Sequence, residues 1–335
     1  MLVFLFLWVW PMRYSHYIMS SYLSSPLFAY DKSKNLLLKA TLPFLIIVHH
    51  ALNYLPTNEL HFIELYGGHI AMFAFFGMSG YGLMHCYRER KNYLNGFLQR
   101  SFQKLFVPLI IAFILFLIFR FAQGTSPIDY LCNTHWLGYV SFSWFIFCLA
   151  CFYLFFFLVF KFVMATDLVK VLIVCCLVFA YVVIVKSQTT LAHHYNRCLS
   201  FCVGMIVALY DKKIRSLLVR WHVLVLMLGT VLLIIIVHFA FSIYSITLLS
   251  VLVGALVFML LYLIPPIPET RICNFFSSIC FEMYIVQGIA FDFVLQNMGI
   301  KSFYAAIPIV LIIDIVLAYL VHKVDRWVLK KISMC

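Results

Sequence analysis

Charged residues are scarce in this sequence. Asp, Glu, Lys and Arg make up 11% of the 335 residues, whereas a soluble domain carries about a quarter. Hydrophobic residues reach 65%, which is more than the core of one soluble domain can bury. The composition therefore excludes an ordinary soluble protein, and no soluble domain or internal repeat interrupts the apolar segments.

Acidic residues are the scarcer of the two charge types. The chain has 12 Asp and Glu against 24 Lys and Arg, which gives a net charge of +12. A basic excess can indicate binding to nucleic acid, but these basic residues lie in short clusters between apolar segments, where membrane proteins have their cytoplasmic loops. We therefore expect the lipid bilayer as a partner and no nucleic acid.

The sequence also lacks a disulfide framework and a metal motif. Most of its 11 cysteines lie within apolar stretches, where cysteine behaves as a small hydrophobic residue. Cys148 and Cys151 have the spacing of a redox or zinc pair, but they lie inside an apolar segment without His or Cys partners nearby. We predict no disulfide and no metal.

Long apolar segments dominate what is present. Lipid offers backbone amides no hydrogen-bonding partner, so a chain crosses the bilayer as a helix of about 20 mostly apolar residues. The sequence predicts an all-α, polytopic membrane protein with about ten transmembrane helices. The predicted spans are residues 36–55, 68–86, 104–122, 141–163, 168–186, 197–210, 222–240, 244–263, 272–296 and 304–323.

The segment before these spans is a separate unit. Residues 1–10 are apolar but too short to span a bilayer, and they lack the basic leader and small-residue cleavage site of a signal peptide. We expect residues 1–30 to form an N-terminal interfacial segment and residues 31–335 to form the transmembrane domain.

The positions of Lys and Arg predict the orientation. With ten spans, 19 of the 24 basic residues fall on the same side as the start of the first span. Arg120, Lys186, Arg197 and Lys301 fall on the opposite side. Because positively charged loops stay in the cytoplasm, both termini are predicted to be cytoplasmic.

A histidine pair lies deep in the first span. If Lys39 marks the cytoplasmic interface, a rise of 1.5 Å per residue places His50 roughly 16 Å above it, near the middle of the hydrocarbon. His49 and His50 could hydrogen-bond to neighbouring helices as packing contacts. Adjacent residues point about 100° apart, however, so at least one should face the protein interior, where ionisable groups mark reaction or ion paths. A neutral imidazole also accepts protons readily near pH 7.

Other polar groups within or beside the spans are further candidates. Arg100 and Lys104 are four residues apart on one predicted helix face, so they could hold phosphates, although such clusters also determine topology. Ser79 lies among small residues that could instead serve close helix packing. Glu282 and Asp314 lie near the centres of the last two predicted spans, where a carboxylate is expected to be functional or paired.

Taken together, these segments resemble acyltransferase family 3, which includes bacterial polysaccharide and peptidoglycan O-acetyltransferases. The family has an Arg followed after ten residues by a His in its first span, and this chain keeps the gap with Lys in place of Arg. The other features in the family's order cover roughly residues 36–325. They are Lys39 with His50, Phe75 to Tyr81, Arg100 with Lys104 and Pro108, Trp144 to Ile146, Arg197 with Phe201 to Gly204, and Ser278 to Gln287, where Gln287 replaces a frequent His.

The resemblance implies transfer of an acyl group, usually acetyl, from cytoplasmic acyl-CoA to a carbohydrate hydroxyl at a bacterial-type plasma membrane. It implies His50 as the catalytic base, while His49 has no such match. We further expect Glu282 to be a catalytic residue. Two other sets of residues are expected to bind the substrates. Lys39, Ser79, Arg100 and Lys104 are expected to bind acyl-CoA, and His69, Trp144 and Arg197 to bind the acceptor.

A secondary transporter is the alternative. In that case the buried histidines, Glu282 and Asp314 would form a proton or substrate relay. The chain shows no inverted repeat and no paired helices broken by Gly and Pro, so the enzyme is favoured.

Overall fold

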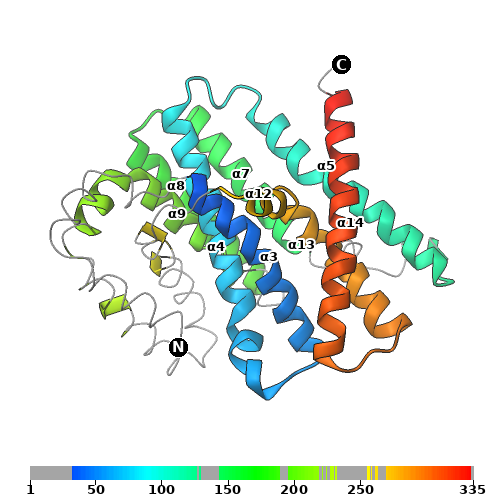
Figure 1. Cartoon of the computed structure of the whole chain (residues 1–335). Coiled ribbons are helices and arrows are strands. Elements are labelled where there is room, and N and C mark those ends of the chain that lie inside the picture. Colours follow the sequence, from blue (N-terminus) through cyan, green and yellow to red (C-terminus); the bar gives the residue numbers. More distant parts are fainter. Residues whose placement is uncertain are drawn as a thin grey trace.

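The chain folds into a bundle of helices in a computed structural model (Figure 1). The structure describes residues 32–126, 128–129, 143–188, 195–218, 221, 224, 227–229, 231, 255–256, 258, 261–262 and 269–332. All regular secondary structure in these residues is helical, which confirms the all-α class. The predicted interfacial segment 1–30 and most of the predicted spans 222–240 and 244–263 lie outside this description.

Eleven helical elements are bounded within the described part. They are α3 (Lys32–Tyr54), the 3-10 turn η2 (Asn58–Leu60), α4 (His61–Glu89), α5 (Phe97–Ala122), α7 (Trp144–Phe162), α8 (Asp167–Gln188), α9 (Ser200–Leu209), α12 (Arg271–Ser278), α13 (Cys280–Asp292), the π-helical turn η5 (Phe293–Asn297) and α14 (Phe303–Ile332).

Five of these helices are long and apolar enough to cross a membrane. They are α3, α5, α7, α8 and α14, and a sixth is added if α12 and α13 form one span with a bend of 64°. The predicted total of about ten is not confirmed by the described residues. The predicted ninth span is broken at Ile279 instead of continuous. Non-helical backbone at membrane depth is tolerated where protein buries it or a water-filled cavity adjoins it, and Ile279 is completely buried.

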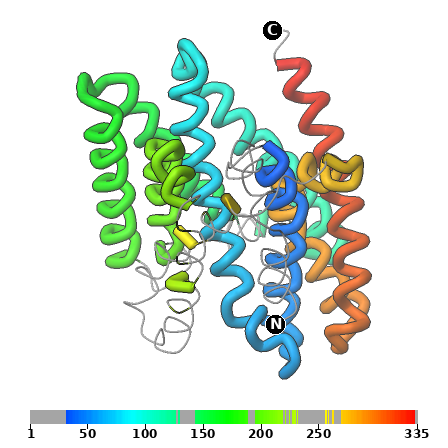
Figure 2. Tube along the Cα trace, turned by 60° about the vertical axis from the view of Figure 1, so that its left-hand side comes forward, coloured from blue at the N-terminus to red at the C-terminus, as the bar shows by residue number. Residues whose placement is uncertain are grey.

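Helix α4 lies between two groups of helices. Figure 2 shows α3, α13 and α14 on one side of α4 and α8 and α9 on the other. Helix α13 packs against α14, α3 and α5, while α4 packs against both α3 and α9. Helix α4 therefore joins the two halves of the bundle.

Small residues explain how closely α4 approaches α9. A Cβ atom at Gly204 would lie 1.9 Å from the backbone oxygen of Gly77, and one at Gly80 would lie 2.0 Å from the backbone oxygen of Phe201. Only glycine permits such contact between the two backbones. The small residues around Ser79 thus serve close packing, while Ser79 itself lies beside the Tyr153 phenol on α7.

Side-chain pairs show which helix ends lie together. Lys32, at the start of α3, lies 3.2 Å from Glu269, next to the start of α12. At the opposite end, Arg120 of α5 lies 2.5 Å from Asp292 of α13. From the start of α3 to the start of α12 the chain therefore crosses the bundle an even number of times, as the predicted orientation requires. We call the end with Lys32 the inner end and the end with Arg120 the outer end. The assignment of the inner end to the cytoplasm stays a prediction.

The bundle is apolar on the outside and partly polar within. On α5 an exposed stripe is formed by Ile110, Ile114 and Ile118, which are 50 to 60% exposed and repeat every four residues. By contrast, Gln287 and Asp314 are completely buried. This distribution fits a protein whose surface faces lipid and whose polar groups face its own interior.

Candidate active site

Helix α13 holds His50 of α3 through a buried glutamine. His50 Nδ1 lies 2.9 Å from Gln287 Oε1, and Gln287 Nε2 donates to the backbone oxygen of Tyr284 at 2.7 Å. Because the amide nitrogen is used at Tyr284, the amide oxygen faces the imidazole, so Nδ1 carries the hydrogen of this bond. The neutral ring then has its lone pair on Nε2, which makes Nε2 the basic atom.

His49 is held differently, between α3 and α4. Its Nδ1 lies 3.2 Å from the backbone oxygen of Ile63, and its Nε2 lies 3.4 Å from Asn53 Nδ2. A Cβ atom at Gly68 would lie 2.5 Å from the His49 ring. His49 thus fills the space above a glycine and has a partner for each nitrogen, which is the geometry of a packing histidine.

The three residues expected to bind the acceptor lie together. Arg197 Nε donates to His69 Nδ1 at 3.1 Å, and the Arg197 guanidinium lies 5.9 Å from the centre of the Trp144 ring. These residues come from the turn before α9, from α4 and from α7. Arg197 also interacts electrostatically with His49, and His49 with His69, so this cluster adjoins the histidine pair.

Glu282 has a partner that the sequence did not reveal. Its Oε1 lies 2.7 Å from Nδ1 of His322 on α14, and the two side chains are 6% and 21% exposed. Glu282 therefore pairs with His322, whereas His50 pairs with Gln287. Asp325 lies one turn further along α14 and interacts electrostatically with both members of the pair.

Lys39 lies on the same inner side of the site. Its ammonium and Glu282 both interact electrostatically with the Cys280 thiol, at the start of α13. Within the described residues Lys39 has no hydrogen bond or ion pair. Lys39 therefore connects α3 to the inner part of α13, about 16 Å along α3 from His50.

The two basic residues predicted to bind phosphates lie at the start of α5. Arg100 Nη1 and Nη2 donate to the backbone oxygens of Asn95 and Tyr93 at 2.6 and 2.8 Å. These bonds fix the loop between α4 and α5. Lys104 is exposed one turn later. Their role in binding a donor stays a prediction.

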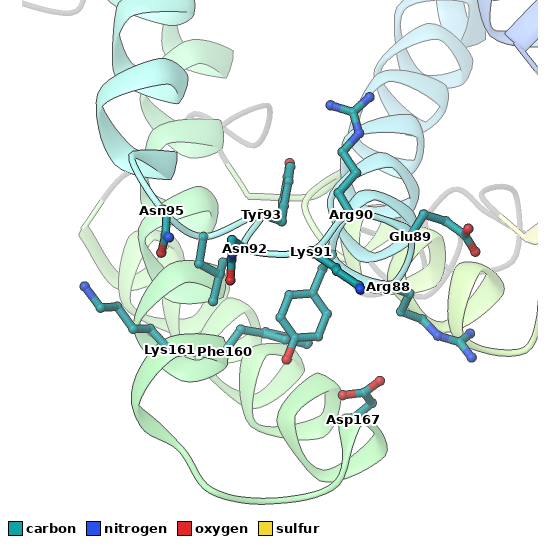
Figure 3. A pocket seen from close by; sticks show the side chains of 12 residues that line it. Arg88, Glu89, Arg90, Lys91, Asn92, Tyr93, Asn95, Phe160, Lys161 and Asp167 are labelled. Atoms are coloured by element: carbon teal, nitrogen blue, oxygen red, sulfur yellow. The ribbon is translucent and has the colours of Figure 1, made fainter.

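A cavity of about 760 Å³ lies under this loop (Figure 3). The loop, the end of α4 and the α7–α8 connection line it, with Tyr87, Asn92, Phe160, Lys161 and Asp167 among the side chains. Neighbouring Tyr93 contributes a phenol whose pKa is raised, mainly by burial, so it stays protonated near neutral pH. The cavity thus combines aromatic, amide and basic groups at the inner end.

The cysteine pair of the fourth predicted span has a local role. Cys148 Sγ lies 2.9 Å from the Tyr181 hydroxyl of α8. Within the described residues, no group of three or more His, Cys, Asp and Glu side chains is arranged to hold a metal ion.

Comparison with known families decides which family the chain belongs to. A family model described as an acyltransferase domain, that of acyltransferase family 3, matches residues 37–323. The chain belongs to acyltransferase family 3. No curated protein and no solved structure matches it significantly. Its apolar helices and its family together make it a membrane acyltransferase.

In this acyltransferase the predicted site residues other than Ser79 form four groups. His50 is held by Gln287 in the bundle, His69 meets Arg197 and Trp144 beside it, and Lys39 lies near Glu282 on the inner side. Arg100 and Lys104 form a separate group at the start of α5. The sequence missed His322, although a histidine at the inner end of the last predicted span, after a span with a glutamate near its centre, was the available signal.

Proposed function

We propose that this membrane acyltransferase moves an acyl group, usually acetyl, from acyl-CoA at the inner end to a carbohydrate hydroxyl. His50 is the general base. The observation that carries the proposal is the partly buried hydrogen bond between His50 Nδ1 and Gln287 Oε1, which leaves the lone pair of the neutral ring on Nε2. The inner end is the cytoplasmic face of a bacterial-type plasma membrane.

The chemistry follows from the base. A sugar hydroxyl is a poor nucleophile near pH 7, and a neutral imidazole within hydrogen-bond reach takes its proton as the oxygen attacks. The oxygen forms a bond to the thioester carbonyl carbon, the carbon–sulfur bond breaks, and the electron pair leaves with sulfur. The products are the O-acyl sugar and the free thiol of coenzyme A.

The polar cluster beside the histidine pair supports a carbohydrate acceptor. The Trp144 ring offers an apolar face, and the Arg197 guanidinium beside it offers hydrogen-bond donors that suit hydroxyl oxygens. His69 holds the guanidinium in place through Nδ1. We assign acceptor binding to these three residues.

The inner cavity supports a nucleotide-bearing donor. Tyr87 and Phe160 are aromatic surfaces for a base, and Arg90, Lys91 and Lys161 in the lining provide positive charge for phosphates. Arg100 is bonded to the loop that covers the cavity, and Lys104 follows it on α5. Tyr87 lies about 28 Å along α4 from Gly68, which touches His49. A donor held here therefore needs a long arm to bring its acyl group to His50, and the pantetheine arm of coenzyme A is such a group.

The test uses inside-out membrane vesicles from the native host, in which the tested variant is the only copy of this protein. Acetyl-CoA labelled in the acetyl group is added, and label is measured in the polysaccharide fraction. We expect transfer by the wild type and a loss of about 10²- to 10⁴-fold for His50→Gln. His61→Gln is the matched control, because His61 is an exposed histidine paired with Glu64.

Retention of full transfer by His50→Gln would show that His50 is not the base. If the wild type labels no glycan, the proposed acyl transfer itself is wrong. The transporter hypothesis would then be favoured. Proton-driven solute uptake by the same vesicles would test it.

A further inference from the structure

The pair formed by Glu282 and His322 has no place in the reaction described so far. It is a partly buried hydrogen bond of 2.7 Å between α13 and α14, which lie side by side (Figure 1). The glutamate is 6% exposed, whereas the histidine is 21% exposed. The imidazole is therefore the more accessible member of the pair.

The order of groups along α13 relates this pair to His50. From the inner end, α13 presents Cys280, Glu282 and Gln287, and its neighbours there are Lys39, His322 and His50. Glu282 and Gln287 are separated by five residues, or about 7.5 Å of helix rise. Two imidazoles thus lie at successive depths, with His322 nearer the end from which the donor enters.

A second proton-transfer group on that side would serve the departing sulfur directly. When the carbon–sulfur bond breaks, the electron pair leaves as a thiolate, and an unpaired anion is costly among membrane-spanning helices. His50 holds the hydroxyl proton at this stage, and it would have to reach the sulfur as well as the oxygen with the same Nε2 to deliver it. A proton donor at the inner side of the thioester would complete the step.

We propose that His322 is this donor, a catalytic acid that protonates the departing thiolate through Nε2, with Glu282 as its positioning residue. The proposal rests on the proposed function. The carboxylate accepts the Nδ1 hydrogen bond and fixes the ring, so Nε2 is the atom that exchanges the proton. His322 gives one proton to sulfur, His50 gains one from the hydroxyl, and water restores both histidines after the product thiol leaves.

The test compares pH–rate profiles in the same inside-out vesicles with labelled acetyl-CoA. A base and an acid acting together give a bell-shaped profile. For His322→Gln we expect a rate about 100-fold lower and the loss of the alkaline limb. Glu282→Gln should lower the rate by a smaller factor and keep both limbs. The exposed pair of His61 and Glu64 supplies the control, because His61→Gln should retain the wild-type profile.

Three results would overturn the proposal. They are a wild-type profile without an alkaline limb, full activity in His322→Gln, and a lowered rate in His322→Gln with both limbs unchanged. The last would assign the pair a structural role, since a group that only supports the fold does not change the shape of the profile. Absence of glycan label in the wild type at every pH would instead refute the proposed function. Groups that face the pair, Asp325, Lys39 and Cys280, stay unchanged in all variants.

Discussion

Replacement of Gln287 by Leu separates catalysis from stability. Gln287 is completely buried and supplies the acceptor for His50 Nδ1. Leucine fills a similar volume without that acceptor, so the imidazole loses the contact that fixes its tautomer and orientation. Loss of one partner of a buried hydrogen bond costs about 1 to 3 kcal/mol. If this cost falls on the transition state, the rate drops by about 10- to 100-fold, because 1.36 kcal/mol is tenfold in rate.

The stability of the same variant should fall by no more than the same amount, about 1 to 3 kcal/mol. Leucine removes a buried polar group, and the Tyr284 carbonyl that Gln287 contacts lies within helix α13. The assay measures acetyl transfer at saturating acetyl-CoA, normalised to the amount of protein, together with the thermal unfolding midpoint in detergent. Gln188→Leu, at an exposed position near the end of α8, is the control. Transfer by Gln287→Leu within threefold of the wild type would refute the role given to this hydrogen bond.

Three further predictions concern the fold. Gly204→Leu should prevent α4 and α9 from packing, because its Cβ atom would lie 1.9 Å from the Gly77 oxygen; folded protein in membranes should fall sharply, whereas Gly82→Ala, with nothing within 4 Å, should be tolerated. Arg120→Met should destabilise the protein by about 1 to 3 kcal/mol, since it leaves the partly buried Asp292 without its ion pair; thermal unfolding measures this, and Asp292→Asn in the same chain should restore part of the loss. Lys331→Cys should react with an impermeant thiol reagent only from the cytoplasm, and Lys301→Cys only from outside, because α14 lies between the two positions. Equal labelling of both variants from one side would contradict the orientation.

The helices could be predicted from the sequence where the apolar segments are long. The predicted spans 104–122 and 168–186 correspond to α5 and α8, because an apolar segment in lipid has no alternative to the helix. Polar helix ends were missed. Helix α4 begins at His61, seven residues before the predicted span, and α14 continues to Ile332, nine residues beyond it. Hydropathy does not show how far a helix continues beyond the hydrocarbon layer of the membrane.

The break between α12 and α13 could not be predicted. Residues 272–296 are apolar on both sides of Ile279, and neither Gly nor Pro marks the bend of 64°. The bend depends on packing with helices distant in the sequence. Sequence patterns report local preference and do not contain such contacts.

The candidate site, like the fold, could be predicted only where the local sequence decides it. Depth in the span and spacing from Lys39 selected His50, and both depend on local sequence. The partners could not be derived in this way, because His50 and Gln287 are separated by 237 residues, and Glu282 and His322 lie on different helices. The placement of Glu282 beside His322 instead of His50 needed the folded bundle.

The central claim is that His50, and not its neighbour His49, takes the proton of the acceptor hydroxyl. The most direct measurement compares the rate of acetyl transfer at saturating acetyl-CoA for His50→Gln and His49→Gln, with the unfolding midpoint of each. The account predicts a loss of about 100-fold or more for His50→Gln at nearly unchanged stability. For His49→Gln it predicts a lower unfolding midpoint and a rate, per folded protein, within about tenfold of the wild type. Equal losses of rate in the two variants, or a larger loss for His49→Gln, would contradict the account.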